Sequence, residues 1–432
     1  MLNWKKFVVT GALATTLTFS SFSAMAANFD DLSGSEGEMA IHKLVTLGII
    51  VDKDTYFNPE SGLTRLEFAE IASRIVPLSA AKAVKIKDVN TTKGQNAAVL
   101  KVLNTGLLAL NKNGEYKPKS NITQGELAKA LAYGLGFKKA WSNRPIDYLF
   151  YLERKGVLDI DTDLDAAVTR EEAAVAIDKY MLVKEGYKTK KGIIAGLTAT
   201  GFSLKNESGV VSYKLAANAS VFLDAQQGEK DNLATGTDVQ ILFNSKNEVA
   251  YVSGDGLELV DGKLGYAGGN LTFNDAAKKF NLNAIVSNLP NNPTAAFTFT
   301  EFSNYASKAD VKFEGALYSS TVTDEVTMLE PYVTKIEKFK PAKIAGDTVT
   351  FDFSGFALKN LAFKFAEGAK FNIVETVKDE ATGKTEDKAK EATLADIVAL
   401  QSAGKVITAN LEAGADGTAT VLTVKAADPV KK

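Results

Sequence analysis

The chain has 432 residues, of which 45% are hydrophobic and 24% are charged, and its formal net charge is -2. This length suggests two or more domains, and a charge so near zero leaves no basic footprint for nucleic acid. The absence of cysteine excludes disulfide bridges and thiolate chemistry, and a single histidine, His42, argues against a Ser-His-Asp triad or a histidine-based zinc site.

Residues 1–26 have the pattern of a secretory signal peptide. Basic Lys5 and Lys6 precede an apolar stretch over about residues 7–22, and the small residues of the Ala24-Met25-Ala26 segment form a cleavage signal. A membrane anchor is the alternative, but the stretch is short for a span and ends in that signal. We therefore predict an exported chain that begins at Ala27. No later stretch is long and apolar enough to span a bilayer.

A helix start with the capping-box pattern recurs three times after the signal peptide. In each copy a Thr precedes a Glu by three positions, so that the Thr hydroxyl accepts from the backbone of the third helical residue. Upstream of each start, an apolar helix ends at a glycine with the signature of the residue just past a helix C-terminus. The three starts and their glycines are Thr64/Glu67 with Gly48, Thr123/Glu126 with Gly106, and Thr169/Glu172 with Gly156. We predict three helix–loop–helix repeats, each too small to bury its own apolar face.

These copies resemble the surface-layer homology (SLH) repeats of bacterial cell-surface proteins. The resemblance covers about a third of the chain and rests on Phe-Asp-Asp-Leu at 29–32, Leu-Gly-Ile at 47–49, Phe-Asn-Pro at 57–59 and Thr-Arg-x-Glu at 64–67. The second copy has Gln124 in place of Arg, and the third keeps Arg170 but lacks the opening Phe-x-Asp and the aromatic-x-Pro loop. The resemblance implies an α-helical bundle of pseudo-threefold arrangement, with repeats over 27–80, 81–138 and 139–183. It also implies that grooves between the repeats bind an acidic, often pyruvylated, secondary cell-wall polysaccharide.

Arg65 and Arg170 occupy the first helical position, where the helix dipole disfavours a cation. A planar guanidinium beside free backbone N–H groups is suited to a carboxylate, so an acidic polymer would offset this local cost. The helix-end glycines would let backbone approach a sugar closely. We predict that Arg65, Arg170, Gly48, Gly156, Gln124 and Gly106 bind polymer, with Arg65 contributing most. The alternative is that the two arginines pair with neighbouring acids.

An acidic loop in the third repeat has the oxygen-ligand spacing of a calcium loop. Asp161, Asp163 and Asp165 precede Glu172, which lies eleven residues after Asp161. Ala166 stands where such loops need glycine, and Glu172 also belongs to the capping box. A solvated loop is therefore the simpler interpretation, with calcium as the only cofactor that the sequence offers.

The second half of the chain switches to alternating apolar and polar residues. After a charged linker over 184–191, we predict all-β modules, small barrels or sandwiches, at 192–254, 255–333 and 334–426, with a tail at 427–432. Residues 212–223 can be laid on 362–373, and 249–252 on 421–424, which indicates that the first and last modules are copies. The middle stretch is a candidate for a diverged third copy.

The sequence as a whole favours an exported, non-enzymatic structural protein of the cell surface, S-layer or S-layer-like, held to the wall by its SLH repeats. Its expected partners are the wall polysaccharide and copies of itself in a lattice. A wall-tethered adhesin or carbohydrate-binding protein is the alternative. A wall-active glycosidase needs only two carboxylates and ranks behind both.

Overall fold

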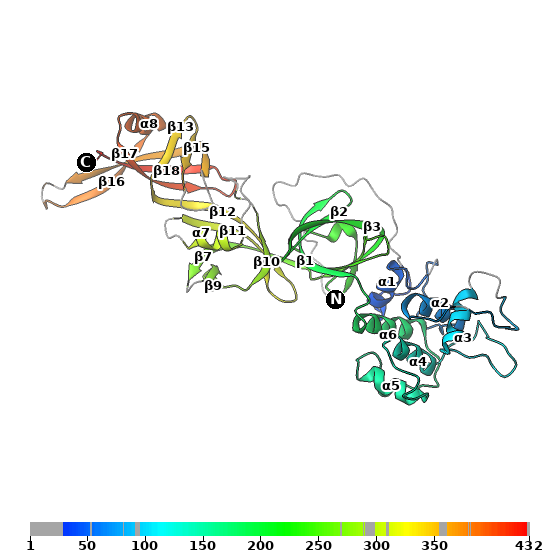
Figure 1. The fold of residues 1–432 in the computed structure, drawn as a ribbon. Helices are drawn as coiled ribbons and strands as arrows, with labels where there is room; N and C mark the ends of the chain where they lie inside the picture. Colours follow the sequence, from blue (N-terminus) through cyan, green and yellow to red (C-terminus); the bar gives the residue numbers. More distant parts are fainter. Residues whose placement is uncertain are drawn as a thin grey trace.

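The computed structural model describes residues 29–51, 54–80, 82–90, 96–267, 270–287, 289, 299–307, 311–353, 361–378, 380 and 382–429. The predicted signal peptide and the last three residues of the predicted tail lie outside these ranges. The molecule is elongated: the helical region forms one end, and the strand-rich parts follow it in chain order toward the other (Figure 1). Among the described helices, none has the length and apolarity needed to cross a membrane.

Three helix pairs make up the helical region between Phe29 and Val183. The helices are α1 (Glu38–Thr46), α2 (Arg65–Ile75), α3 (Asn96–Thr105), α4 (Gln124–Gly134), α5 (Pro145–Glu153) and α6 (Arg170–Val183). The second helix of each pair starts directly after the predicted Thr, and all three capping boxes are formed. Past the first helices, Gly48, Gly106 and Gly156 have φ of 73°, 77° and 70°, a region that favours glycine. The predicted helix starts and helix ends are therefore confirmed.

A single apolar core joins the three pairs. Ile41 of α1, Phe68 of α2, Val99 of α3, Leu131 of α4 and Ile177 of α6 all belong to this core. Each is at most 1% exposed. Burial of this kind is the main force that holds such short helices together, because isolated helices of this length are marginal in water.

A small barrel follows the helices. It contains β1 (Thr189–Thr198), β2 (Gly201–Asn206), β3 (Gly209–Leu223), β5 (Asp238–Phe243) and β6 (Val249–Gly254), with β4 (Gln226–Gly228) on the end of β3 and η1 (Lys230–Asn232) before β5. The strands pair in the closed order β1-β2-β3-β6-β5, and β5 returns to β1. Inward side chains such as Ile194, Phe202 and Ile241 form its core.

The predicted linker 184–191 is part of the folded structure. Thr189, Lys190 and Lys191 already pair with β5, so β1 starts three residues before the predicted module. Lys184 Nζ donates to the carbonyl of Ile75 at 2.6 Å, which ties the end of α6 to the end of α2. The charged composition of this segment thus marks a solvated surface and not a free connection.

The barrel packs directly on the outer face of α1. His42 is fully buried there, with its ring edge-on to Phe29 and Phe222 and its Nδ1 3.4 Å from Ser220 Oγ. Burial lowers the pKa of His42 from 6.5 to about 4, so the ring is neutral at neutral pH. Beside it, Lys43 Nζ forms an ion pair with Asp178 at 2.8 Å. The helical region and the barrel therefore share a packed interface.

Two further strand sets continue the chain, joined into one sheet. The middle set contains β7 (Leu257–Ala267), β8 (Asn270–Phe273), β9 (Ala276–Ala277), β10 (Phe280–Val286), α7 (Phe299–Ala306), β11 (Val311–Ser320) and the first half of β12 (Val326–Phe339). The last set contains the rest of β12 with β13 (Pro341–Ala345), β14 (Thr348–Phe351), β15 (Leu361–Lys378), β16 (Thr385–Ala392), α8 (Leu394–Ser402), β17 (Val406–Ala413) and β18 (Ala419–Ala427). The prediction of an all-β half is wrong in one respect, since α7 and α8 are helices. Thr393 caps α8 through a box with Asp396 that the sequence analysis did not use.

The same register irregularity occurs in all three strand sets. In each, a parallel pair advances five residues on one strand while its partner advances two. The steps run from Leu215↔Val249 to Ser220↔Tyr251, from Phe280↔Val326 to Ile285↔Met328, and from Phe365↔Ala419 to Lys370↔Val421. A bulge of this kind bends a strand at a defined place.

Two details differ from the expected copies. Val249 corresponds to Ala419 by its pairing, so the predicted match of 249–252 with 421–424 is two residues out of register. Strand β12 also runs through the predicted boundary at 333/334: its pairing with β11 extends to Ile336, and its pairing with β17 begins at Lys335. A continuous strand connects the middle and last sets.

Candidate functional site

A ring of side chains joins the starts of α2, α4 and α6. In each case the first residue of one helix donates to the capping-box Glu of the next. Arg65 Nη1 donates to Glu126 Oε1 at 2.5 Å, Gln124 Nε2 donates to Glu172 Oε2 at 3.1 Å, and Arg170 Nη1 pairs with Glu67. Each of these Glu side chains therefore serves its own helix cap and a neighbouring pair at the same time.

The backbone just before these helices forms a matching ring. The N–H of Leu63 donates to Val168 O, that of Val168 to Ile122 O, and that of Ile122 to Leu63 O, at 2.8, 3.1 and 3.0 Å. Since each segment donates to one neighbour and accepts from the other, the three helix starts are fixed relative to one another. The side-chain ring stands on this scaffold.

The guanidinium of Arg65 makes its contacts with other protein groups and is little exposed to solvent. Besides Glu126, its guanidinium donates to Tyr116 O and Ala109 O, both at 2.8 Å, and lies 5.0 Å from the Tyr116 ring centre. Its side chain is only 12% exposed. Burial raises the pKa of Tyr116, against the influence of the Arg65 charge, so the phenol stays neutral. These contacts correspond to the alternative interpretation, in which the arginine pairs with neighbouring acids.

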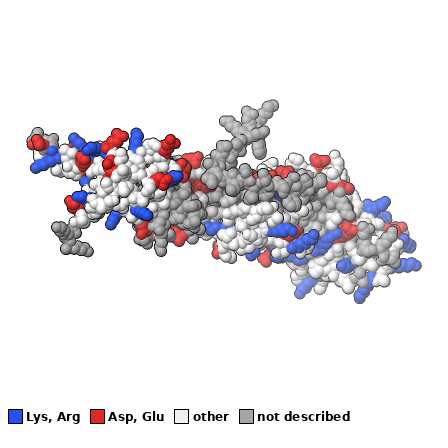
Figure 2. All heavy atoms as spheres, turned by 90° about the horizontal axis from the view of Figure 1, so that it is seen from above, with Lys and Arg blue, Asp and Glu red and all other residues white. Residues whose placement is uncertain are grey.

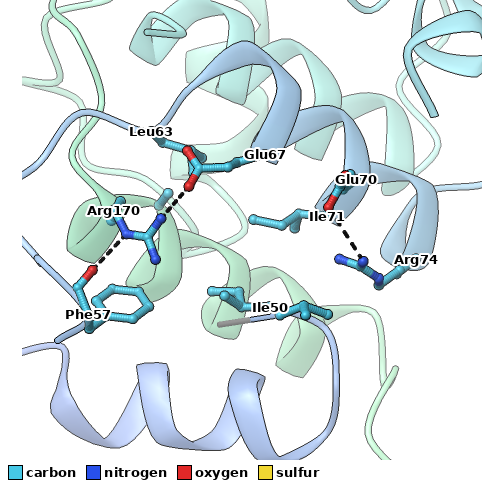
Figure 3. Close-up of a pocket in the computed structure, with 10 residues that line it drawn as sticks. Ile50, Phe57, Leu63, Glu67, Glu70, Ile71, Arg74 and Arg170 are labelled. Atoms are coloured by element: carbon cyan, nitrogen blue, oxygen red, sulfur yellow. Dashed lines mark hydrogen bonds and ion pairs between the residues drawn. The ribbon is translucent and has the colours of Figure 1, made fainter. Parts of the chain in front are cut away.

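Arg170 has the same kind of contacts but also lines a pocket. Its Nε donates to Phe57 O at 2.8 Å and its guanidinium lies 4.5 Å from the Phe57 ring centre. The pocket lies between the first and third helix pairs, and Figure 3 shows Arg170 and Glu67 on one side of it and Glu70 and Arg74 on the other. Its lining residues are Ile50, Val51, Phe57, Leu63, Glu67, Glu70, Ile71, Arg74, Arg170 and Ala173.

Arg74 is a pocket residue that the sequence analysis missed. Its Nη1 donates to Ile49 O at 2.9 Å and its Nη2 lies 3.8 Å from Glu70 Oε2. The side chain is 32% exposed, more than twice the value for Arg170. Arg74 lies in the last turn of α2, and this turn faces the Leu-Gly-Ile helix end of the same pair. That position is the sequence signal that could have identified it.

The opening Asp of the family motif has a structural task. Asp31 accepts from the N–H groups of Phe57 and Asn58, at 2.8 and 2.6 Å, and Asp88 accepts from those of Tyr116 and Lys117, at 2.8 and 2.7 Å. In the first two pairs this carboxylate fixes the aromatic loop residue on which the Arg guanidinium lies. The Asp of the motif therefore positions the aromatic side chains that pack against the two arginines of the side-chain ring.

The predicted glycines lie at equivalent places, and open space surrounds all three Cβ positions. Gly48 directly precedes Ile49, which accepts from Arg74, and Ile50, which lines the pocket. Gly106 and Gly156 end α3 and α5 in the same way. Their predicted role toward a polymer stays a prediction.

The calcium spacing is not matched by a calcium geometry. Among the described residues, no group of three or more His, Cys, Asp or Glu side chains gathers as metal ligands would. Asp163 instead accepts from the N–H of Asp165 at 3.0 Å, and Glu172 is bound by Thr169 N–H and Gln124. The sequence spacing of Asp161, Asp163, Asp165 and Glu172 thus describes an acidic turn followed by a helix cap.

Comparison with known families gives matches in the first two helix pairs. The family described as S-layer homology domain matches residues 28–69 and 85–128, which contain α1, the start of α2, α3 and the start of α4. No curated protein matches the chain. S-layer homology domains imply anchoring to the cell wall through binding of a secondary cell-wall polymer. The two matches support the assignment of this chain as an SLH-domain surface protein.

Proposed function

We propose that all three helix pairs form one SLH bundle with pseudo-threefold symmetry, although the family matches cover only the first two. The support comes from contacts that the third pair repeats. Thr169 forms the same capping box as Thr64 and Thr123, and Arg170 and Glu172 occupy the same positions in the side-chain ring. Val168 takes its place in the backbone ring.

We further propose that the pocket between the first and third pairs binds an acidic, pyruvylated wall polysaccharide. The observation that carries this proposal is the convergence of Arg74 and Arg170 on one hollow bounded by apolar Ile50 and Ile71. A carboxylate entering it would replace Glu67 as an acceptor from Arg170 and Glu70 as the ion-pair partner of Arg74. Arg74 is the more accessible of the two and would meet the ligand first.

The protein as a whole is proposed to be an exported structural component of an S-layer or similar surface coat, with no enzymatic activity. Its rigid bundle would present its binding grooves together, so that weak sites add by effective concentration. The barrel and the two further strand sets extend away from the bundle and would form the outer part, available for contacts with other copies (Figure 1).

The test is co-sedimentation of the chain from Ala27 onward with cell-wall sacculi, before and after removal of the acidic polymer. We expect binding that weakens with salt and is lost on stripped walls. Arg74→Gln should weaken binding while the helical signal and melting temperature stay unchanged, and Lys112→Gln, an equal loss of charge at an exposed loop, should have little effect. Undiminished binding to stripped peptidoglycan, or by Arg74→Gln, would contradict the proposal.

A further inference from the structure

A second hollow lies on the outer face of α5, apart from the ring and its pocket. It is lined by two exposed aromatic side chains, Trp141 at 58% and Phe150 at 46% exposure, with basic residues around them. The complete lining is Phe137, Trp141, Ser142, Arg144, Asp147, Phe150, Tyr151, Arg154 and Lys155. We call this surface the α5 groove.

The equivalent face is covered in the other two helix pairs. His42, Leu100 and Phe150 each lie six residues before the helix-end glycine, yet they are 0%, 8% and 46% exposed. The barrel covers His42 through Phe222. Beside Leu100, the side chain of Asn104 donates to Ala80 O and Lys82 O, so the connecting segment crosses that face. Only at α5 does the described chain leave this face open.

The aromatic part of the α5 groove is held in place from below. Phe137, which is buried, contacts Trp141 edge-on at 5.2 Å between ring centres, and contacts Tyr151 in the same way at 5.3 Å. Tyr151 is fixed in turn by its hydroxyl, which donates to Leu135 O at 2.8 Å. Because these contacts already fix the Trp141 ring, it loses little conformational entropy when a ligand packs on its exposed face.

The rim of the α5 groove is basic. Residues 137–155 contain five Lys and Arg against two Asp and Glu. Arg144 donates to Asp147 through both Nε and Nη2, at 2.9 and 2.8 Å, which lowers the pKa of Asp147, and Arg154 and Lys155 are exposed. Basic side chains are not confined to this rim: on the face seen in Figure 2, Lys and Arg also gather at the end that the helical region forms.

The distribution of arginine along the chain also distinguishes the side-chain ring, its pocket and the α5 groove. The chain has five arginines, all between residues 65 and 170, whereas lysine is spread along its whole length. Arg65 and Arg170 belong to the ring, Arg170 and Arg74 line its pocket, and the remaining two line the α5 groove. Because guanidinium groups are suited to planar anions, this distribution marks the α5 groove as a place for anion recognition.

We propose that the α5 groove binds an acidic glycan chain at a site separate from the pocket between the first and third helix pairs. A sugar ring would pack on Trp141 and Phe150, and its carboxylate or similar anionic group would bind Arg154 and Lys155. Charge separates this from docking of a protein domain. The positions in the first pair that correspond to Arg154 and Lys155 are the uncharged Thr46 and Leu47, and Leu47 packs against the barrel. The proposal goes beyond the wall-anchoring function and does not depend on it.

Trp141 is the only tryptophan after residue 26, so its fluorescence reports directly on the groove in the chain from Ala27 onward. The probe is hexagalacturonate, with its fully methyl-esterified form as a neutral ligand of the same backbone. We expect hexagalacturonate to shift the Trp141 emission and to bind, by calorimetry, at least tenfold more tightly than the ester. Trp141→Ala and Arg154→Gln should each weaken binding by about tenfold, the equivalent of 1.4 kcal/mol. Lys112→Gln, an equal loss of charge at an exposed loop, should leave it unchanged.

Three results would overturn the proposal. One is equal binding of the acid and its ester, and another is unchanged binding by Arg154→Gln, whose exposed side chain can be replaced without loss of a core contact. The third is tighter binding of hexaglutamate than of hexagalacturonate, which would assign the α5 groove to an acidic peptide. Because the probe is soluble, none of these outcomes depends on whether the chain sediments with cell walls.

Discussion

Arg65 at the start of α2 donates to Glu126 near the start of α4, with 2.5 Å between Nη1 and Oε1. This contact accounts for a cation at a helix position where the dipole disfavours it. The carboxylate that caps one helix neutralises the arginine that opens another. Arg65 is unfavourable within its own helix, but it connects two helix pairs.

Replacement of Arg65 by Ala should destabilise the helical region by about 2–3 kcal/mol, because a mostly buried Glu126 loses its ion pair and two carbonyls lose their donors. The measurement is urea unfolding followed by circular dichroism at 222 nm. Arg65→Lys keeps the charge but cannot reach three acceptors at once, so it should fall between Ala and the native chain. Equal stability of all three proteins would show that the contacts of Arg65 contribute nothing measurable to the free energy of unfolding.

A second prediction concerns acid. The pKa of His42 is lowered from 6.5 to about 4, so between these values the unfolded chain binds more protons than the folded one. The stability that depends on neutral His42 is therefore complete above about pH 6.5, falls as the pH drops, and is lost by about pH 4. The expected loss is about 3 kcal/mol, concentrated at the interface of α1 with the barrel.

The control is His42→Leu, since Leu100 occupies the equivalent position in the second helix pair. Urea unfolding at pH 7.5 and pH 4.5 should show a smaller difference for this variant than for the native chain. All other titratable groups are the same in the two proteins, so the comparison isolates the histidine. A difference as large in the variant as in the native chain would mean that other groups carry the acid sensitivity.

The sequence predicted what depends on near neighbours and missed what depends on distant ones. Thr64 and Glu67 are three residues apart, and their capping box follows from that spacing. His42 and Ser220 are 178 residues apart, and nothing in the local pattern of either indicates that a barrel covers α1. The ring also depends on contacts between helix pairs, so the sequence identified Arg65 as unusual without identifying its partner. Similarly, Trp141 gave no periodic signal, because its exposure is a property of the assembled surface.

A third prediction corrects the domain boundary. A fragment that begins at Gly192 lacks Thr189, Lys190 and Lys191, which provide three of the five pairs between β1 and β5. A fragment that begins at Gly186 keeps these pairs and should have the higher melting temperature. Amide exchange of Ile241 and Leu242 would locate the difference, since their strand partners are removed in the shorter fragment. Equal protection in both fragments would show that the barrel closes without those residues.

The last prediction compares the three equivalent positions at the helix starts. Arg65 and Arg170 each combine an ion pair with hydrogen bonds to backbone carbonyls, whereas the uncharged Gln124 donates to the Glu172 carboxylate and forms no ion pair. Stability should therefore fall similarly for Arg65→Ala and Arg170→Ala and much less for Gln124→Ala.

Binding to wall sacculi should follow a different order, because among these three only Arg170 lines the pocket between the first and third pairs. At a temperature where every variant remains folded, Arg170→Ala should weaken binding most, Arg65→Ala less and Gln124→Ala least. This reverses the order expected from family resemblance, which places Arg65 first. If Arg65→Ala loses binding most while still folded, polymer recognition lies at the junction of the first and second pairs. The ion pair with Glu126 would then be the contact that the ligand exchanges.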